Sequence, residues 1–363
     1  PDRPGAWLTL VARRAALDRI RRRRGRDDAI DERLEATLAA PSNEDEGEDP
    51  EVRSGVGDER LRLVFTCCHP ALNREAQVAL TLRTLSGLTT REIARAFLEP
   101  EATTAQRIVR AKKKIEAAGI PYEIPPREAL PERLEAVLEV VYLIYNEGYT
   151  ATEGTALVRV AVAEEAIRLG RVLEELVPGE PEVKGLLALM LFPHARRATR
   201  LDDEGRLVPL DAQNRSRWDR AEIAEATGLL DAAIAGGGRG PYVVQAAIAS
   251  LHANAPTAGE TDWKQIAALY RRLLELRPAP VVELNAAVAL AMAEGPERGL
   301  AWLDALEKDG ALARYHLLPA ARAELLRKAG DLAAARAAYD EALALVKNPA
   351  ERRHLEARVL SLV

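Results

Sequence analysis

The sequence predicts an all-α protein, and three observations support this fold class. Ala, Leu, Arg and Glu dominate the 363 residues and aromatic residues make up only 4% of them, a composition that favours helices over strands. Apolar residues recur at helical spacing along most of the chain. Stretches rich in Pro or Gly, at 120–131 (IPYEIPPREALP) and 235–240 (AGGGRG), divide this pattern into helical segments.

The charge of the chain is unevenly distributed, although its formal net value is only −5. Residues 1–26 hold nine basic and two acidic groups, residues 27–60 hold three basic and thirteen acidic groups, and residues 61–120 hold ten basic and five acidic groups. Two basic segments therefore flank an acidic one. We expect the first third of the chain to bind a polyanion and the mildly acidic remainder not to do so.

The first elements follow from this charge pattern and from apolar spacing. Residues 5–24 (GAWLTLVARRAALDRIRRRR) form one predicted helix with an apolar first half and a basic second half. Residues 27–57 have few large apolar side chains, so we expect an acidic, flexible linker there. Helical periodicity resumes at Asp58 and continues to Ser86-Gly87, a pair that typically ends a helix.

Residues 89–115 (TTREIARAFLEPEATTAQRIVRAKKKI) predict two helices joined by a tight turn at 98–100. Thr89 or Thr90 is a suitable cap for the first helix, and Thr103 lies in the first turn of the second. Steps of about 100° per residue place apolar residues on one face of the second helix and polar or basic residues on the other. Such a helix is suited to the DNA major groove, although a solvated charged face is the simpler alternative. The predicted DNA-contacting residues are Thr103, Thr104, Gln106, Arg107, Arg110, Lys113 and Lys114.

These two helices resemble the helix-turn-helix with which sigma region 4 of bacterial sigma factors reads the promoter −35 element. The resemblance rests on the spacing from Glu92 to Thr103 and on an R-x-x-R-A-(K/R)3 signature at Arg107–Lys114. One departure is Leu98, because the family often has Gly in this turn. The resemblance implies an all-α transcription initiation factor whose partners are promoter DNA and core RNA polymerase.

A second resemblance lies upstream, where residues 6–24 are similar to the −10 reading helix of sigma region 2 in the extracytoplasmic-function group. Trp7, Leu8, Arg13 and Asp18 match that pattern, whereas Arg14 stands where Asn is common. The family's first domain begins before this helix, so we expect the chain to be truncated at its N-terminus. The residues implied in −10 contacts are Arg13, Arg14, Asp18, Arg19, Arg21 and Arg22.

The remainder of the chain resembles a subgroup that carries a large tetratricopeptide-type C-terminal extension. The segments that carry this resemblance include FTCCHPAL, YLIYNEGY and LDDEGRLVPLDAQNRSRWD. Tyr270 and Tyr339 are 69 positions apart, close to two repeats of about 34 residues. The predicted organisation is a region 2 remnant (1–26), the linker (27–57), region 4 (58–120), a helical extension with an ordered polar loop (121–240) and tetratricopeptide-like helices (241–363).

Polar residues gather within the otherwise apolar extension. We weigh two interpretations: a pocket for a small anionic signal or a protein partner, or a loop fixed by salt bridges and hydrogen bonds, which we favour. The candidate pocket residues are Asn146, Glu147, His194, Arg196, Arg197, Gln213 and Arg215. Cys67 and Cys68, followed by His69, lack the spaced partner ligands of a zinc site and are expected to be small buried hydrophobes.

The sequence thus predicts a sigma factor rather than an enzyme, with no cofactor and no metal. The run GGGRG lacks the GK(S/T) ending of a phosphate-binding loop, and no nucleophile–base set is evident. The only two cysteines are adjacent and so rarely form a structural disulfide, and no run is long enough to span a bilayer; both observations indicate a cytoplasmic setting without a membrane partner. The alternative is a tetratricopeptide-type interaction scaffold whose helix-turn-helix is vestigial or binds DNA non-specifically, and a dimeric repressor is a weaker third option.

Overall fold

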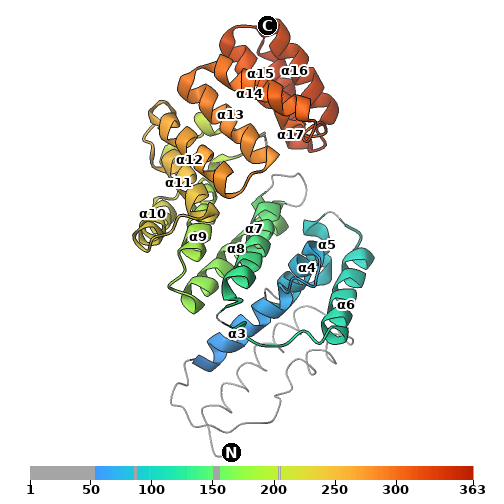
Figure 1. The fold of residues 1–363 in the computed structure, drawn as a ribbon. Helices are drawn as coiled ribbons and strands as arrows, with labels where there is room; N and C mark the ends of the chain where they lie inside the picture. The colour runs from blue at the N-terminus through green and yellow to red at the C-terminus, as the bar shows by residue number, and fades with distance from the viewer. Residues whose placement is uncertain are drawn as a thin grey trace, which may run out of the picture. The chain divides into compact units, whose positions relative to one another are not determined.

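The computed structural model describes residues 54–362, except for 86, 87, 98, 127, 150–155, 203 and 205, and for a few of the described residues it gives the backbone alone. These residues form helices α3 to α17 (Figure 1). The one β-bridge among them joins Leu201 and Leu207. The predicted all-α fold is confirmed. The predicted −10 helix lies outside the described residues, together with its candidate contacts Arg13, Arg14, Asp18, Arg19, Arg21 and Arg22.

The helix-turn-helix unit consists of α3 (Ser54–Cys67), α4 (Arg74–Thr84), α5 (Thr90–Ala96) and α6 (Glu101–Ala117). Helix α3 begins four residues earlier than the predicted start at Asp58. Helix α5 begins with a reciprocal cap: the Glu92 amide donates to Thr89 Oγ1 at 3.2 Å, and the Thr89 amide donates to Glu92 Oε2 at 2.8 Å. Of the two candidate caps, Thr89 and Thr90, it is thus Thr89 that caps this helix.

Helix α4 is covered on several sides. Seven successive residues, Ala76–Leu82, are buried, and a helix buried all round needs partners on more than one face. Helices α5 and α6 contact it from one direction and α7 (Leu130–Tyr149) from another. One hydrophobic core therefore extends from Leu61 to Ala253, across the proline-rich segment 120–131. The prolines mark a turn in the chain between helices that share this core.

The other helices around this core are α8 (Ala156–Leu176), α9 (Pro181–His194), α10 (Arg220–Ala235) and α11 (Pro241–Asn254). Between α9 and α10 the polar loop forms short 3-10 turns at Arg197–Thr199, Leu210–Ala212 and Arg215–Arg217. The Asp219 side chain then caps α10 by accepting from the amides of Ala221 and Glu222.

The C-terminal helices pack against one another in chain order. They are α12 (Trp263–Leu276), α13 (Pro280–Glu294), α14 (Pro296–Asp309), α15 (Leu317–Ala329), α16 (Leu332–Leu345) and α17 (Pro349–Leu360). Several small hydrophobic clusters stabilise this region, as expected where each helix contacts mainly its neighbours in the chain. Tyr270 lies in α12 and Tyr339 in α16, so the second tyrosine follows the first by four helices, or two helix pairs. None of the described helices has both the length and the apolar character needed to cross a membrane.

Candidate nucleic-acid interface

Helix α6 lies at the outer side of the helix-turn-helix unit. It packs on α4 and α5, and these two helices in turn contact α7 and α8 (Figure 1). Ile108 and Ala111 are buried in its inner face. This is the apolar face that helical spacing predicted, because residues three or four positions apart lie above one another on a helix. The opposite face of α6 points away from the core.

The exposed face of α6 carries polar groups at its start and cations further along. Thr103, Gln106, Arg110, Lys113 and Lys114 are all exposed. The acidic side chains of α6, Glu101 and Glu116, lie near its two ends. The middle of this face therefore presents a positive surface, and Glu116 follows its last two cations, Lys113 and Lys114, within one helical turn.

Two residues of the predicted set are less exposed than the others and contact Glu99. Thr104 is fully buried (0% exposed), and its hydroxyl lies 3.2 Å from Glu99 Oε2. Thr104 shares the inner face with Ile108 and Ala111, four and seven positions later, so its side chain cannot take the predicted role of a DNA contact. Arg107 is half-buried, and its Nη1 and Nη2 donate to the two carboxylate oxygens of Glu99 at 2.7 and 2.9 Å. This bidentate pair joins α6 to the turn before it.

The start of α4 contributes to the same surface, although none of its residues is among the predicted DNA contacts. Leu72, Asn73 and Ala76 line a groove of about 300 Å³ together with Thr103, Gln106, Arg107, Arg110, Ala111 and Lys114. The Asn73 side chain caps α4 by accepting from the Ala76 amide at 3.0 Å, and helix N-termini carry a partial positive charge. The groove thus combines a helix N-terminus with basic side chains, a suitable environment for a phosphate. The sequence signal for this helix start is Asn73, a residue type that often caps helices, directly before the helical run of α4.

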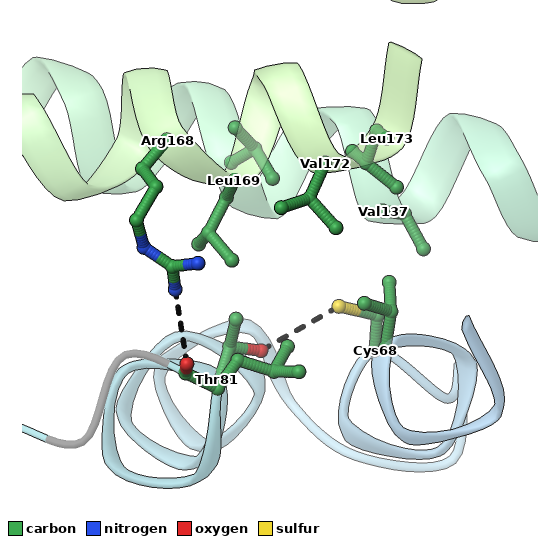
Figure 2. Close-up of a pocket in the computed structure, with 10 residues that line it drawn as sticks. Cys68, Thr81, Val137, Arg168, Leu169, Val172 and Leu173 are labelled. Carbon is green, nitrogen blue, oxygen red and sulfur yellow. Dashed lines mark hydrogen bonds between the residues drawn. The ribbon is translucent and has the colours of Figure 1, made fainter. Parts of the chain in front are cut away.

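The inner side of the helix-turn-helix unit is joined to α7 and α8 (Figure 2). Arg168 of α8 donates to the Leu85 carbonyl at 3.0 Å, and Arg133 of α7 donates to the Phe65 carbonyl at 2.7 Å. Glu139 of α7 pairs with Arg74 at the start of α4 and with Arg277 after α12. A cavity of about 20 Å³ remains in this junction, enough for about one water molecule. These contacts hold the helix-turn-helix unit against α7 and α8, and they leave the outer face of α6 exposed.

The two cysteines lie in this junction as buried groups. Cys68 Sγ is 3.6 Å from Thr81 Oγ1 (Figure 2). Burial raises the pKa of the Cys68 thiol to about 11 and that of the Cys67 thiol further still. Both thiols are therefore protonated at neutral pH and poorly suited to bind a metal or to attack an electrophile.

The candidate pocket residues separate into two groups. His194 Nδ1 lies 2.9 Å from Glu222 Oε1, and Arg197 Nη1 lies 2.8 Å from Glu222 Oε2. Gln213 is buried and donates to the Val208 carbonyl, while Arg215 donates to the carbonyls of His252 and Ala255. These four side chains fix the loop, as the interpretation that we favoured expects. Asn146 and Arg196 instead line a cavity, and the side chain of Glu147 lies outside the described residues.

Comparisons with known proteins find two family models that match segments of this chain and one relative that matches nearly all of it. Residues 62–115 match the model of sigma-70 region 4, and residues 133–234 match a family of unknown function, DUF6596. An uncharacterized protein of Rhizobium meliloti (strain 1021), R00370, is 44% identical over 356 residues, which cover 98% of this chain and 83% of the relative. The first match spans the helix-turn-helix unit, and the second spans α7 to α10.

Proposed function

Because this chain belongs to the same family as the Rhizobium meliloti protein and is a sigma-70 family member through its region 4, we propose that it is a sigma factor of the extracytoplasmic-function group. It would direct bacterial RNA polymerase to specific promoters and begin DNA-templated transcription. The observation that carries this proposal is the exposed face of α6, where Thr103 and Gln106 precede Arg110, Lys113 and Lys114. Sigma-70 region 4 proteins are transcription factors and not enzymes.

The division of labour on this surface follows from the chemistry of each group. Thr103 and Gln106 offer hydrogen-bond donors and acceptors at the start of α6, the part of a recognition helix that meets base edges in the major groove. Arg110, Lys113 and Lys114 offer cations for phosphates, as does the N-terminus of α4. Arg107 and Thr104 act indirectly, since through Glu99 they fix the angle at which α6 leaves the turn. The −10 contacts would come from the predicted helix of residues 5–24.

The C-terminal extension would modulate this activity in two ways. Helices α7 and α8 support the helix-turn-helix unit from the side opposite to α6, so the extension presents the DNA-reading face. Its later helices, α12 to α17, pack against one another in chain order, and as tetratricopeptide-like repeats they would offer a surface for a protein partner or for the polymerase. No described residue of α7 to α17 lines the groove at α6, which favours a supporting role over an inhibitory lid.

DNA binding by the full chain tests the role of α6. The double variant Arg110→Ala/Lys114→Ala should weaken binding to a duplex by about 1–3 kcal/mol and lower the salt slope by about two, because each lost phosphate contact removes about one unit. The matched control is Arg217→Ala/Lys308→Ala, which removes the same charge from exposed positions elsewhere. Fluorescence anisotropy over a series of salt concentrations measures both quantities. An equal loss in the two double variants would contradict a specific role for α6.

Transcription in vitro separates the sigma factor from the scaffold alternative. Core polymerase with the full chain is supplied with fragmented genomic DNA, and the 5′ ends of the transcripts are mapped. A sigma factor yields starts that share −35 and −10 sequences and that disappear in the Arg110→Ala/Lys114→Ala variant. A scaffold with a vestigial helix-turn-helix yields no such set of starts.

A further inference from the structure

A cavity of about 490 Å³ lies in the extension, bounded by α7, α9, α11, α12, α13 and the polar loop. Its walls are mainly apolar and aromatic, with Leu189, Phe192, Trp218, Ile248 and Leu273 among them. This volume and this lining are typical of sites that bind small molecules. Arg133, Glu139 and Arg168, which join α7 and α8 to the helix-turn-helix unit, do not line this cavity.

The charge of the cavity is unusual for this chain. Acidic groups outnumber basic ones by 56 to 51 in the whole sequence, yet the described residues that line the cavity include no Asp or Glu and one arginine, Arg196. The Arg196 guanidinium donates to Gln213 Oε1 at 3.3 Å, and no carboxylate of the described residues pairs with it. By contrast, its neighbour Arg197 is paired with Glu222. Arg196 is therefore a half-buried cation at the cavity wall, and none of the described acidic residues is its partner.

The other polar groups of the cavity are neutral. Burial, together with the nearby charges of Arg196 and Arg215, lowers the pKa of His252 to about 4, so its imidazole is uncharged at pH 7. Burial raises the pKa of Tyr270 to about 12, so its hydroxyl stays protonated. Asn285 adds an amide to the same cavity. These groups can donate or accept hydrogen bonds but cannot neutralise the guanidinium.

We propose that this cavity is a binding site for a small, largely aromatic or apolar molecule that carries one negatively charged group, held by Arg196. An anion placed there gains a charge-assisted hydrogen bond with a cation that no acid of the described residues already occupies. The apolar part of the ligand is removed from water by the aromatic walls. The inference rests on the geometry of the extension alone and is independent of whether the protein binds promoters.

Two fluorescent probes that share one aromatic skeleton test both parts of the proposal. The first, 8-anilinonaphthalene-1-sulfonate, carries a negative charge; the second, N-phenyl-1-naphthylamine, lacks the sulfonate. We expect saturable binding of the anionic probe to one site of the full chain, at least about tenfold tighter than the neutral probe. Arg196→Met should remove most of this difference, whereas Arg196→Lys should retain part of it. The control Arg217→Met, an exposed arginine of the same loop that does not line the cavity, should change neither affinity.

A second variant locates the site independently of charge. Ala249 lines the cavity, and Ala249→Phe should fill part of it and weaken binding of both probes about tenfold or more, with the helical circular dichroism spectrum unchanged. The proposal is overturned if neither probe saturates a single site. It is also overturned if Arg196→Met and Arg217→Met have equal effects, or if Ala249→Phe leaves both affinities unchanged.

Discussion

At the scale of single residues, Glu99 shows how one side chain in a turn can set the direction of a helix. Its carboxylate accepts from the hydroxyl of Thr104 and from both terminal nitrogens of Arg107. Both donors belong to α6, whereas Glu99 precedes it. Arg107 thus differs from Arg110, three positions later, which is exposed. The two arginines of the R-x-x-R signature therefore differ in their surroundings: Arg107 is paired with Glu99, and Arg110 is the one that we propose contacts DNA.

His252 is a residue whose protonation should be visible in the stability of the protein. Its folded pKa of about 4 lies below the ordinary value of 6.5, because burial disfavours the charged form. Between these two pH values the unfolded chain binds a proton that the folded chain does not. The free energy of unfolding contributed by His252 is therefore fully present above pH 6.5 and is lost as the pH falls towards 4, by at most about 1.4 kcal/mol per pH unit.

Urea unfolding of the wild type and of His252→Gln at pH 7, 6 and 5 measures this contribution. The wild type should lose more stability than the variant as the pH is lowered. Other titrating groups with a lowered pKa, such as His354, are present in both proteins and cancel in the difference. Parallel losses in the two proteins would show that His252 does not titrate as its surroundings predict.

At the scale of elements, the close contact of α9 with α11 depends on Gly185. A Cβ added there would lie 2.7 Å from the backbone nitrogen of Val243 and 2.8 Å from its Cγ2, so the two helices can approach this closely only without a side chain. Gly185→Ala should lower the free energy of unfolding by about 1–3 kcal/mol, because the overlap outweighs the better helix propensity of alanine.

Gly228, in the middle of α10, is the matched control for this prediction. A Cβ there would meet nothing within 4 Å, so Gly228→Ala should raise the free energy of unfolding by about 0.5–1 kcal/mol. Chemical unfolding followed by circular dichroism gives both values. Stabilisation by both substitutions would mean that α9 and α11 are less tightly packed than described.

At the scale of the whole molecule, the helix-turn-helix unit and the extension are parts of one folding unit. Phe65 and Leu82 of the unit belong to the same buried core as Val137 of α7 and Leu173 of α8. A fragment of residues 54–120 would expose the apolar side that α7 and α8 cover. We expect it to lack a cooperative unfolding transition, because a chain of this size has little other apolar surface to bury.

A fragment of residues 54–255 is the control, since it retains the core that extends from Leu61 to Ala253. It should unfold cooperatively and give a dispersed amide spectrum by nuclear magnetic resonance, whereas the spectrum of 54–120 should be narrow. Dispersed spectra from both fragments would instead show that the helix-turn-helix unit folds by itself.

Much of the local structure could be predicted because it depends on neighbours in sequence. The caps at Thr89 and the apolar face through Ile108 follow from hydrogen bonds and from helical spacing within a few residues. The same spacing predicted the exposure of Gln106, Arg110 and Lys114. It did not reveal that Glu99 holds Arg107, because the reach of a long side chain across a turn depends on how α5 and α6 pack.

What the sequence by itself determined is the helical fold, the register of α6 and the basic face of that helix, which lies within the segment that matches sigma-70 region 4. Only the tertiary structure decided which distant groups meet. It brought the start of α4 beside α6, it joined α4 to α7 through Glu139, and it left Arg196 in a cavity with Asn285, 89 positions later. The physical reason is that periodicity is a local property, whereas a cavity and its charge arise from the packing of helices that are far apart along the chain.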